Sequence, residues 1–194
     1  MKKILGAFFL FYTITAAGQN NISNIKLTSS ITTDVGKVAT DYYYQFNNIK
    51  GEKISETDNI IEYSSKITPH GALESTIIQI KNLENSYSWQ ALMLDTEDYK
   101  QAVTKYKLLY KQLNGARLSF GERKFYTLKG IYDAPDETRG FASTLLALET
   151  TESEMRQFKI EVALNYAMPE WSVKIFVYEK EDDADIRPTV NSDY

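Results

Sequence analysis

The stretch FKIEVALNYAMPEWSVKIFVYE, residues 158–179, decides the fold class of this chain. Apolar side chains occupy every second position in each of its halves, and a short link at 167–170 separates the halves. A period of two is typical of strands that bury one face, and a short link favours an antiparallel hairpin. We therefore predict strands at 157–166 and 171–179. Their apolar faces consist of Phe158, Ile160, Val162 and Leu164 and of Trp171, Val173, Ile175 and Val177.

The same period of two recurs in five earlier segments of the chain. These segments are bounded by residues that favour turns, and they are short enough for strands rather than helices. We predict the five further strands at 60–67, 73–82, 87–94, 124–132 and 140–149.

Two segments show apolar residues at helical spacing instead. The first runs from 31 to 49 and has Gly51 just beyond its end as a stop signal. The second begins with Asp95 or Thr96 as its N-cap and stops at the Asn-Gly pair 114–115. Both segments predict amphipathic helices with one apolar face.

A shift of 64 residues brings the two predicted helices into register. Between residues 32–55 and 96–119, six of 24 positions are identical. The run Gly-x-basic-apolar-Ser at 51–55 recurs at 115–119. Two unrelated amphipathic helices that end in glycine would explain the apolar matches, but they explain this run less well. The register therefore favours an internal duplication.

The predicted fold class is α+β, with two layers and the element order αβββ-αβββ-β. The pseudo-repeats cover about 31–94 and 95–166, and a final strand at 171–179 follows them. Because each repeat leaves an apolar face to cover, we expect both helices on one face of a shared antiparallel sheet.

Residues 1–18 have the features of a cleavable secretory signal peptide. A positively charged start, MKK, precedes an apolar run at 4–14 that is too short to remain as a membrane span. Ala16 and Gly18 are small enough for a signal peptidase that cuts before Gln19. A buried N-terminal strand or helix is the alternative. The leader predicts an exported protein, either periplasmic or extracellular.

The remaining chain is predicted to form one domain, 19–181, followed by an acidic tail, 182–194. The tail offers little apolar surface, so we expect it to be disordered; a weak calcium site is the alternative, but the run offers no defined cage. No apolar stretch after the leader is long enough to span a membrane. The formal net charge of −4 and the lack of a basic cluster argue against nucleic acid as a partner.

The rarity of cysteine and histidine limits the chemistry that the chain can perform. It has no cysteine and one histidine, so thiol catalysis, cysteine–zinc sites and histidine clusters are excluded. His70 stands between Pro69 and Gly71, which predicts an exposed turn. The alternative, a Ser-His-Asp site, lacks a Gly-x-Ser-x-Gly elbow. We predict no catalytic residue, no metal ligand and no cofactor.

Carboxylates remain, and a pair of them is sufficient for a glycosidase. One cluster lies at 95–98, where helix capping is the simpler explanation. The other comprises Asp133, Asp136 and Glu137, which suit a solvated turn. A carboxylate-based hydrolase acting on glycans is therefore an alternative function.

Aromatic residues are the positive signal, with 14 tyrosines, nine phenylalanines and two tryptophans. In the run Tyr42-Tyr43-Tyr44, helical geometry forces at least one ring away from the core. Tyrosine suits recognition surfaces, so Tyr43 and Tyr44 are the candidate binding residues, with core packing as the alternative. Trp89 and Trp171 fall on apolar strand faces and are expected in the core.

The sequence predicts an exported accessory protein of a bacterial envelope that binds a protein partner without catalysis. Besides the glycan hydrolase, a purely structural envelope component is an alternative. The sequence makes no prediction about the oligomeric state.

Overall fold

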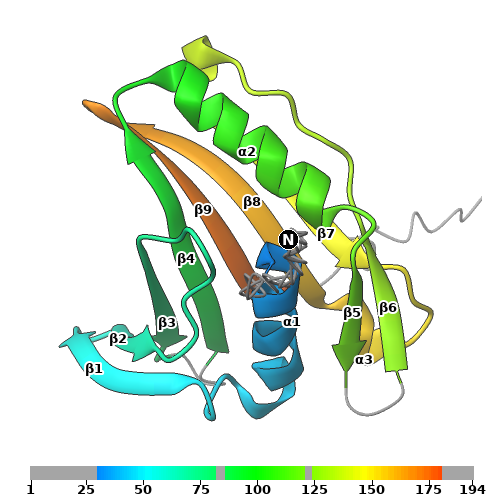
Figure 1. Ribbon diagram of the computed structural model, residues 1–194. Helices are drawn as coiled ribbons and strands as arrows, with labels where there is room; N and C mark the ends of the chain where they lie inside the picture. Colours follow the sequence, from blue (N-terminus) through cyan, green and yellow to red (C-terminus); the bar gives the residue numbers. More distant parts are fainter. Residues whose placement is uncertain (1–29, 82–85, 121–123, 181–194) are drawn as a thin grey trace, which may run out of the picture.

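The computed structural model describes residues 30–81, 86–120 and 124–180, and it contains one large antiparallel sheet with three α-helices (Figure 1). The predicted α+β class is thereby confirmed. The leader predicted at 1–18 and the tail predicted at 182–194 lie outside the described residues. Within the described ranges, no helix is both long enough and apolar enough to cross a membrane.

The chain alternates between helices and antiparallel meanders. The helical elements are α1 (Ile31–Asp41), the 3₁₀ turn η1 (Tyr42–Tyr44), α2 (Tyr99–Leu113), the 3₁₀ turn η2 (Glu137–Arg139) and α3 (Ser153–Arg156). The strands are β1 (Lys50–Glu56), β2 (Ile60–Ser65), β3 (Glu74–Ile80), β4 (Ser86–Thr96), β5 (Arg117–Phe120), β6 (Lys124–Lys129), β7 (Phe141–Leu148), β8 (Phe158–Ala167) and β9 (Glu170–Glu179). Their order in the sheet is β1-β2-β3-β4-β9-β8-β7-β6-β5, so the last strand lies in the middle.

All seven predicted strands are present within about three residues of their predicted ends, but two further strands were missed. The order αβββ-αβββ-β is therefore wrong, because four strands follow each of α1 and α2 before β9. The missed strands, β1 and β5, are the two edges of the sheet. Most of β1 is exposed and β5 has only four residues, so neither shows a long apolar alternation.

The first helix ends earlier than the apolar spacing predicts. It stops at Asp41, and η1 and two residues with positive φ, Gln45 and Phe46, follow it. The Asp41 carboxylate accepts the backbone N–H groups of Asn48 and Ile49, which turns the chain towards β1. The predicted helix over 31–49 is wrong for its second half, although its apolar side chains still reach the core.

Gly51 is not the helix stop that the sequence suggested. It lies in β1, where a Cβ atom would stand 2.3 Å from Ser64 Oγ and 3.0 Å from the Ser64 carbonyl oxygen. Close approach of two strands therefore requires this glycine. Gly115, in contrast, follows the C-cap Asn114 with a φ of 86°, as predicted for the end of the second helix.

The second helix begins later than predicted. Its N-cap is Asp98, whose carboxylate accepts the backbone N–H groups of Lys100 and Gln101. Neither Asp95 nor Thr96 caps it, because β4 continues to Thr96 in register with β9.

One face of the sheet, here called the inner face, packs into the hydrophobic core. A continuous row across four strands shows its character: Trp89, Val177, Ile160 and Leu146 are paired in register and fully buried. Buried side chains of α1 and α2 belong to the same cluster, and α2 contacts β4, β8 and β9. Trp89 and Trp171 are 0% and 5% exposed, which confirms that both are core residues.

Candidate binding groove

The opposite face of the sheet, here called the outer face, carries a groove of about 510 Å³. Residues of β3, β4, β7, β8 and β9 line this groove, so it lies over the middle of the sheet. Its apolar lining includes Ile80, Phe141, Ala163 and Phe176. Concave sites with apolar walls and a few polar groups are typical ligand sites. We name this site the outer groove.

The outer groove follows from the pleat of the strands. One residue away from the inner row lies a second row, in which Gln90, Phe176, Glu161 and Leu145 pair in register. Because neighbouring residues of a strand point to opposite faces, this row faces away from the core. All four residues are only partly buried. The outer row thus combines an aromatic ring and a carboxylate with an amide and an aliphatic side chain.

Glu161 is the polar centre of the outer groove. The Ser143 hydroxyl donates a hydrogen bond to its Oε1, and the Tyr178 hydroxyl donates one to its Oε2 at 2.7 Å. Burial raises the pKa of Tyr178 above its usual range, and the hydrogen bond to Glu161 and the charge of that carboxylate raise it further. None of the ion pairs among the described residues involves Glu161. Two neutral hydroxyl groups therefore hold this carboxylate in place.

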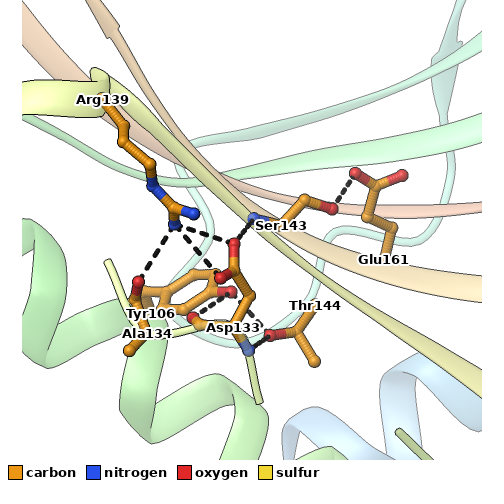
Figure 2. Close-up of polar contacts among 7 residues, drawn as sticks. All are labelled: Tyr106, Asp133, Ala134, Arg139, Ser143, Thr144 and Glu161. Carbon is orange, nitrogen blue, oxygen red and sulfur yellow. Dashed lines mark hydrogen bonds and ion pairs between the residues drawn. The ribbon is translucent and has the colours of Figure 1, made fainter. Parts of the chain in front are cut away.

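A polar network behind the groove holds Ser143 in position (Figure 2). The Ser143 backbone N–H donates to Asp133 Oδ2 at 3.3 Å. Arg139 Nη2 donates to both carboxylate oxygens of Asp133, at 3.1 and 3.0 Å, and to the Ala134 carbonyl at 3.0 Å. The segment between β6 and β7 is thus tied to the strand that supplies Ser143.

The network continues through the sheet to the core. Thr144, the next residue of β7, is fully buried, and its hydroxyl oxygen accepts the Asp133 backbone N–H at 3.1 Å. The Tyr106 hydroxyl lies 2.6 Å from that of Thr144 and donates to the Asp133 carbonyl at 3.1 Å (Figure 2). Burial raises the pKa of Tyr106 to about 12. Asp133 therefore connects a groove residue, Ser143, with a core residue of α2.

The predicted binding residues, Tyr43 and Tyr44, lie away from the outer groove. They belong to η1 and are 51% and 61% exposed. Tyr43 packs edge-on against Phe120, with ring centroids 6.1 Å apart, and its hydroxyl contacts the Met155 sulfur. Tyr42, the first residue of η1, packs against Phe158 at 5.0 Å. Tyr43 and Tyr44 are thus both largely exposed, and neither of them lines the groove.

Asp98, Asp133 and Asp136 of the two acidic clusters have structural partners. Asp98 caps α2, and the Asp136 carboxylate accepts the Thr138 backbone N–H at the start of η2. Asp133 binds Arg139, as described above. Within the described ranges, no group of three or more His, Asp and Glu residues is arranged to hold a metal ion.

His70 is exposed and lies in the turn between β2 and β3. Its backbone N–H donates to Asp34 Oδ2 at 3.1 Å, which ties the turn to α1. The turn also contains Gly71, whose φ of 76° favours glycine. The predicted exposed turn is confirmed.

The residues of the outer groove were not predicted as a site. One signal in the sequence could have indicated them: Phe176 and Tyr178 alternate with the core residues Ile175 and Val177, so an aromatic pair falls on the solvent side of β9. The partnership of Ser143 with Glu161 depends on the pairing of β7 with β8, which local spacing does not specify.

Comparisons of the chain with protein-family models, with curated proteins and with solved structures return no match. The function is therefore inferred from the sequence and the geometry.

Proposed function

We propose that the protein is an exported, non-enzymatic accessory protein of a bacterial envelope that holds a segment of a protein partner in the outer groove. The observation that carries this proposal is the groove itself, about 510 Å³ of space with an aromatic and aliphatic lining on the sheet face opposite the core. Exposed apolar surface of this kind, with polar groups among it, is typical of interaction sites.

The two alternatives have less support. A glycan hydrolase needs two carboxylates facing each other across a cleft, about 5 to 10 Å apart. Glu161 and Glu179 both line the groove, but Glu179 is an odd number of residues from Phe176. Burial raises the pKa of the partly buried Tyr42, and the charge of Glu179 raises it further. The Glu179 carboxylate therefore belongs to the inner side of β9. A purely structural component would need no groove.

We also propose that the fold arose by internal duplication, with both helices covering the inner face. In chain order, each half runs from a helix through a four-stranded meander, and β9 is added at the end. The 64-residue shift carries β2, Ile60–Ser65, onto β6, Lys124–Lys129, without a gap. Superposition of 31–96 on 99–167 in a crystal structure tests this. Different handedness of the two meanders would contradict a duplication.

Export is tested separately, through the N-terminus of the secreted protein. The small residues before Gln19 predict a mature chain that starts there or within about two residues. Intact-mass measurement of exported protein that still carries residues 1–18 would contradict a cleaved leader.

A photo-crosslinking experiment tests the proposed binding surface. Phe141 lies in the groove and is the test position. Phe125, on β6 outside the groove, is its matched control, because both are phenylalanines on strands and their exposed fractions are 55% and 56%. A benzoyl-phenylalanine is introduced at each position, and at Tyr44, in the producing cell. Tandem mass spectrometry then identifies the crosslinked peptide.

We expect one defined partner peptide from position 141 and none from position 125. A partner found only from position 44 would move the binding surface to η1 and contradict the groove. The absence of any crosslinked protein from position 141 would contradict the proposal as a whole.

A further inference from the structure

The outer groove has an unbalanced charge. Its lining residues include Glu161 and no lysine or arginine, and the second lining glutamate, Glu179, directs its carboxylate to the inner side of β9. On the outer face, Glu161 has the apolar residues Phe176 and Leu145 as its direct cross-strand neighbours. A partly buried carboxylate among apolar groups is costly unless a charged or strongly hydrogen-bonding group compensates it. The groove is thus electrostatically suited to a cation.

Three cationic side chains of the surrounding segments do not line the outer groove. Lys174, on β9, lines a separate small hollow together with Glu74 and Leu92, and it does not line the groove. Lys159, two residues before Glu161, is 5% exposed and donates to the Arg156 carbonyl. Arg139 pairs with Asp133. Within the described ranges, none of these groups forms an ion pair with Glu161.

The carboxylate of Glu161 keeps acceptor capacity for a ligand. Each of its oxygens accepts one hydroxyl hydrogen bond, from Ser143 and from Tyr178. A carboxylate offers about four lone-pair positions, so roughly two remain. Hydrogen bonds from a guanidinium or an ammonium to a carboxylate are about twice as strong as neutral ones. The two hydroxyl groups therefore orient the acceptor without satisfying it.

The aromatic lining suits the rest of a basic side chain. Lysine and arginine carry apolar stems that pack on apolar surfaces, and their charged heads are attracted to aromatic faces. Phe141, Phe176 and Tyr178 supply such surfaces in the groove. The chain itself shows this pairing at Tyr87, another lining residue, because the Lys50 ammonium lies 4.4 Å from the ring centroid of Tyr87.

We propose that the outer groove recognises a lysine or arginine side chain of the protein partner, with the cationic head on Glu161 and the stem against Phe176. This inference rests on the proposed function and names the chemistry that the partner presents. The apolar surface of the groove contacts the stem of the basic side chain, and the Glu161 carboxylate binds its charged head.

The experiment uses small probes that differ in charge and keep nearly the same shape. N-acetyl-arginine methylamide, N-acetyl-lysine methylamide and the uncharged N-acetyl-citrulline methylamide are titrated into ¹⁵N-labelled protein, and amide chemical shifts are followed. We expect saturable shifts at groove residues of β8 and β9 with both charged probes. Citrulline is expected to bind at least about tenfold more weakly, since it lacks the charge.

Two variants locate the charge effect. Glu161→Gln keeps the size of the side chain and should weaken the binding of the arginine probe about tenfold. The affinity of this variant for the arginine probe should then be close to that for the citrulline probe. Glu97→Gln removes an exposed carboxylate outside the groove and should leave all three probes unchanged. If Glu161→Gln does not fold, the salt dependence of binding to the unchanged protein replaces it. A higher salt concentration should weaken the binding of the arginine probe and leave the binding of the citrulline probe unchanged.

The outcomes separate this inference from the proposed function. Equal binding of arginine and citrulline, or an unchanged affinity in Glu161→Gln, would overturn the cation site even if position 141 crosslinks to a partner protein. Selective arginine binding without any crosslinked partner would keep the cation site and overturn the protein-binding function. The absence of any shift with all three probes would also overturn the cation site.

Discussion

The two faces of β9 differ sharply, although they belong to the same ten residues. On the inner face, Val173, Ile175 and Val177 are fully buried. On the outer face, Lys174, Phe176 and Tyr178 alternate with them and are only partly buried. Packing restricts the inner positions to apolar residues of fitting size. The outer positions have no such restriction, and their aromatic and charged composition supports the proposed binding role.

The inner row should dominate the stability of the fold. Trp89→Ala removes a fully buried ring, together with its hydrogen bond from Nε1 to Ser65 Oγ at 3.0 Å. We expect a loss of about 3–5 kcal/mol in the free energy of unfolding. Phe125→Ala is the control, because Phe125 is an exposed aromatic residue on β6. It should change the free energy of unfolding by no more than about 0.5 kcal/mol. Chemical denaturation measures both, and similar losses would contradict the contrast.

The polar network between the two faces should contribute less to the stability of the fold than the inner row does. Tyr106→Phe removes the buried hydroxyl that joins Thr144 to the Asp133 carbonyl and leaves the ring in place. Because the Asp133 carbonyl loses a donor and the Thr144 hydroxyl loses its Tyr106 partner, we expect a loss of about 1–2 kcal/mol in the free energy of unfolding. Tyr44→Phe, which removes an exposed hydroxyl, is the matched control. An unchanged stability of Tyr106→Phe would show that the network does not connect the two faces.

The two faces should also differ in how their tyrosines ionise. Burial is the main reason why the pKa of both Tyr106 and Tyr178 is raised, but the Glu161 charge and hydrogen bond contribute only at Tyr178. A raised pKa favours the neutral phenol in the folded state. The resulting stability is complete below the unfolded pKa of about 10 and is lost as the pH rises above it.

Glu161→Gln should therefore lower the pKa of Tyr178 and leave that of Tyr106 near 12. Spectrophotometric titration of tyrosinate measures both pKa values. The variants Tyr178→Phe and Tyr106→Phe assign the two titrations, and circular dichroism confirms that the fold persists. A Tyr178 titration unaffected by Glu161→Gln would contradict the hydrogen bond at the centre of the groove.

The strands were predictable where one face is fully buried, because burial imposes a period of two on the sequence. The edges β1 and β5 bury little, so they left no such pattern. The end of α1 was missed for the opposite reason: Phe46 and Ile49 stay buried after the backbone leaves the helix, so the apolar spacing continues past Asp41.

The candidate groove was not predictable, because it depends on strand order. The predicted hairpin of β8 and β9 brings Glu161 beside Phe176, but the pairing of β9 with β4 brings Gln90 to the other side of that ring. Local spacing showed that Phe176 faces away from the core. It could not show that β4 lies next to β9.

The smallest effect is expected at the lone histidine. His70 is exposed, and the turn is held by its backbone N–H rather than by its ring. His70→Ala should change the free energy of unfolding by no more than about 0.5 kcal/mol, as thermal or chemical denaturation can show. A larger loss would mean that the turn contributes to the core through this side chain.

Two neighbouring residues of β9 test the central claim, that the inner face builds the fold and the outer face binds. Ile175 and Phe176 are adjacent apolar residues, and their side chains lie on opposite faces of β9. Unfolding free energy and arginine-probe affinity are measured together for Ile175→Ala and Phe176→Ala. We predict that Ile175→Ala loses about 2–5 kcal/mol of stability and, while folded, still binds the probe. Phe176→Ala should lose less than about 1 kcal/mol but bind the probe at least about tenfold more weakly. A Phe176→Ala variant that is as unstable as Ile175→Ala, or that binds the probe as well as the unchanged protein does, would contradict the account.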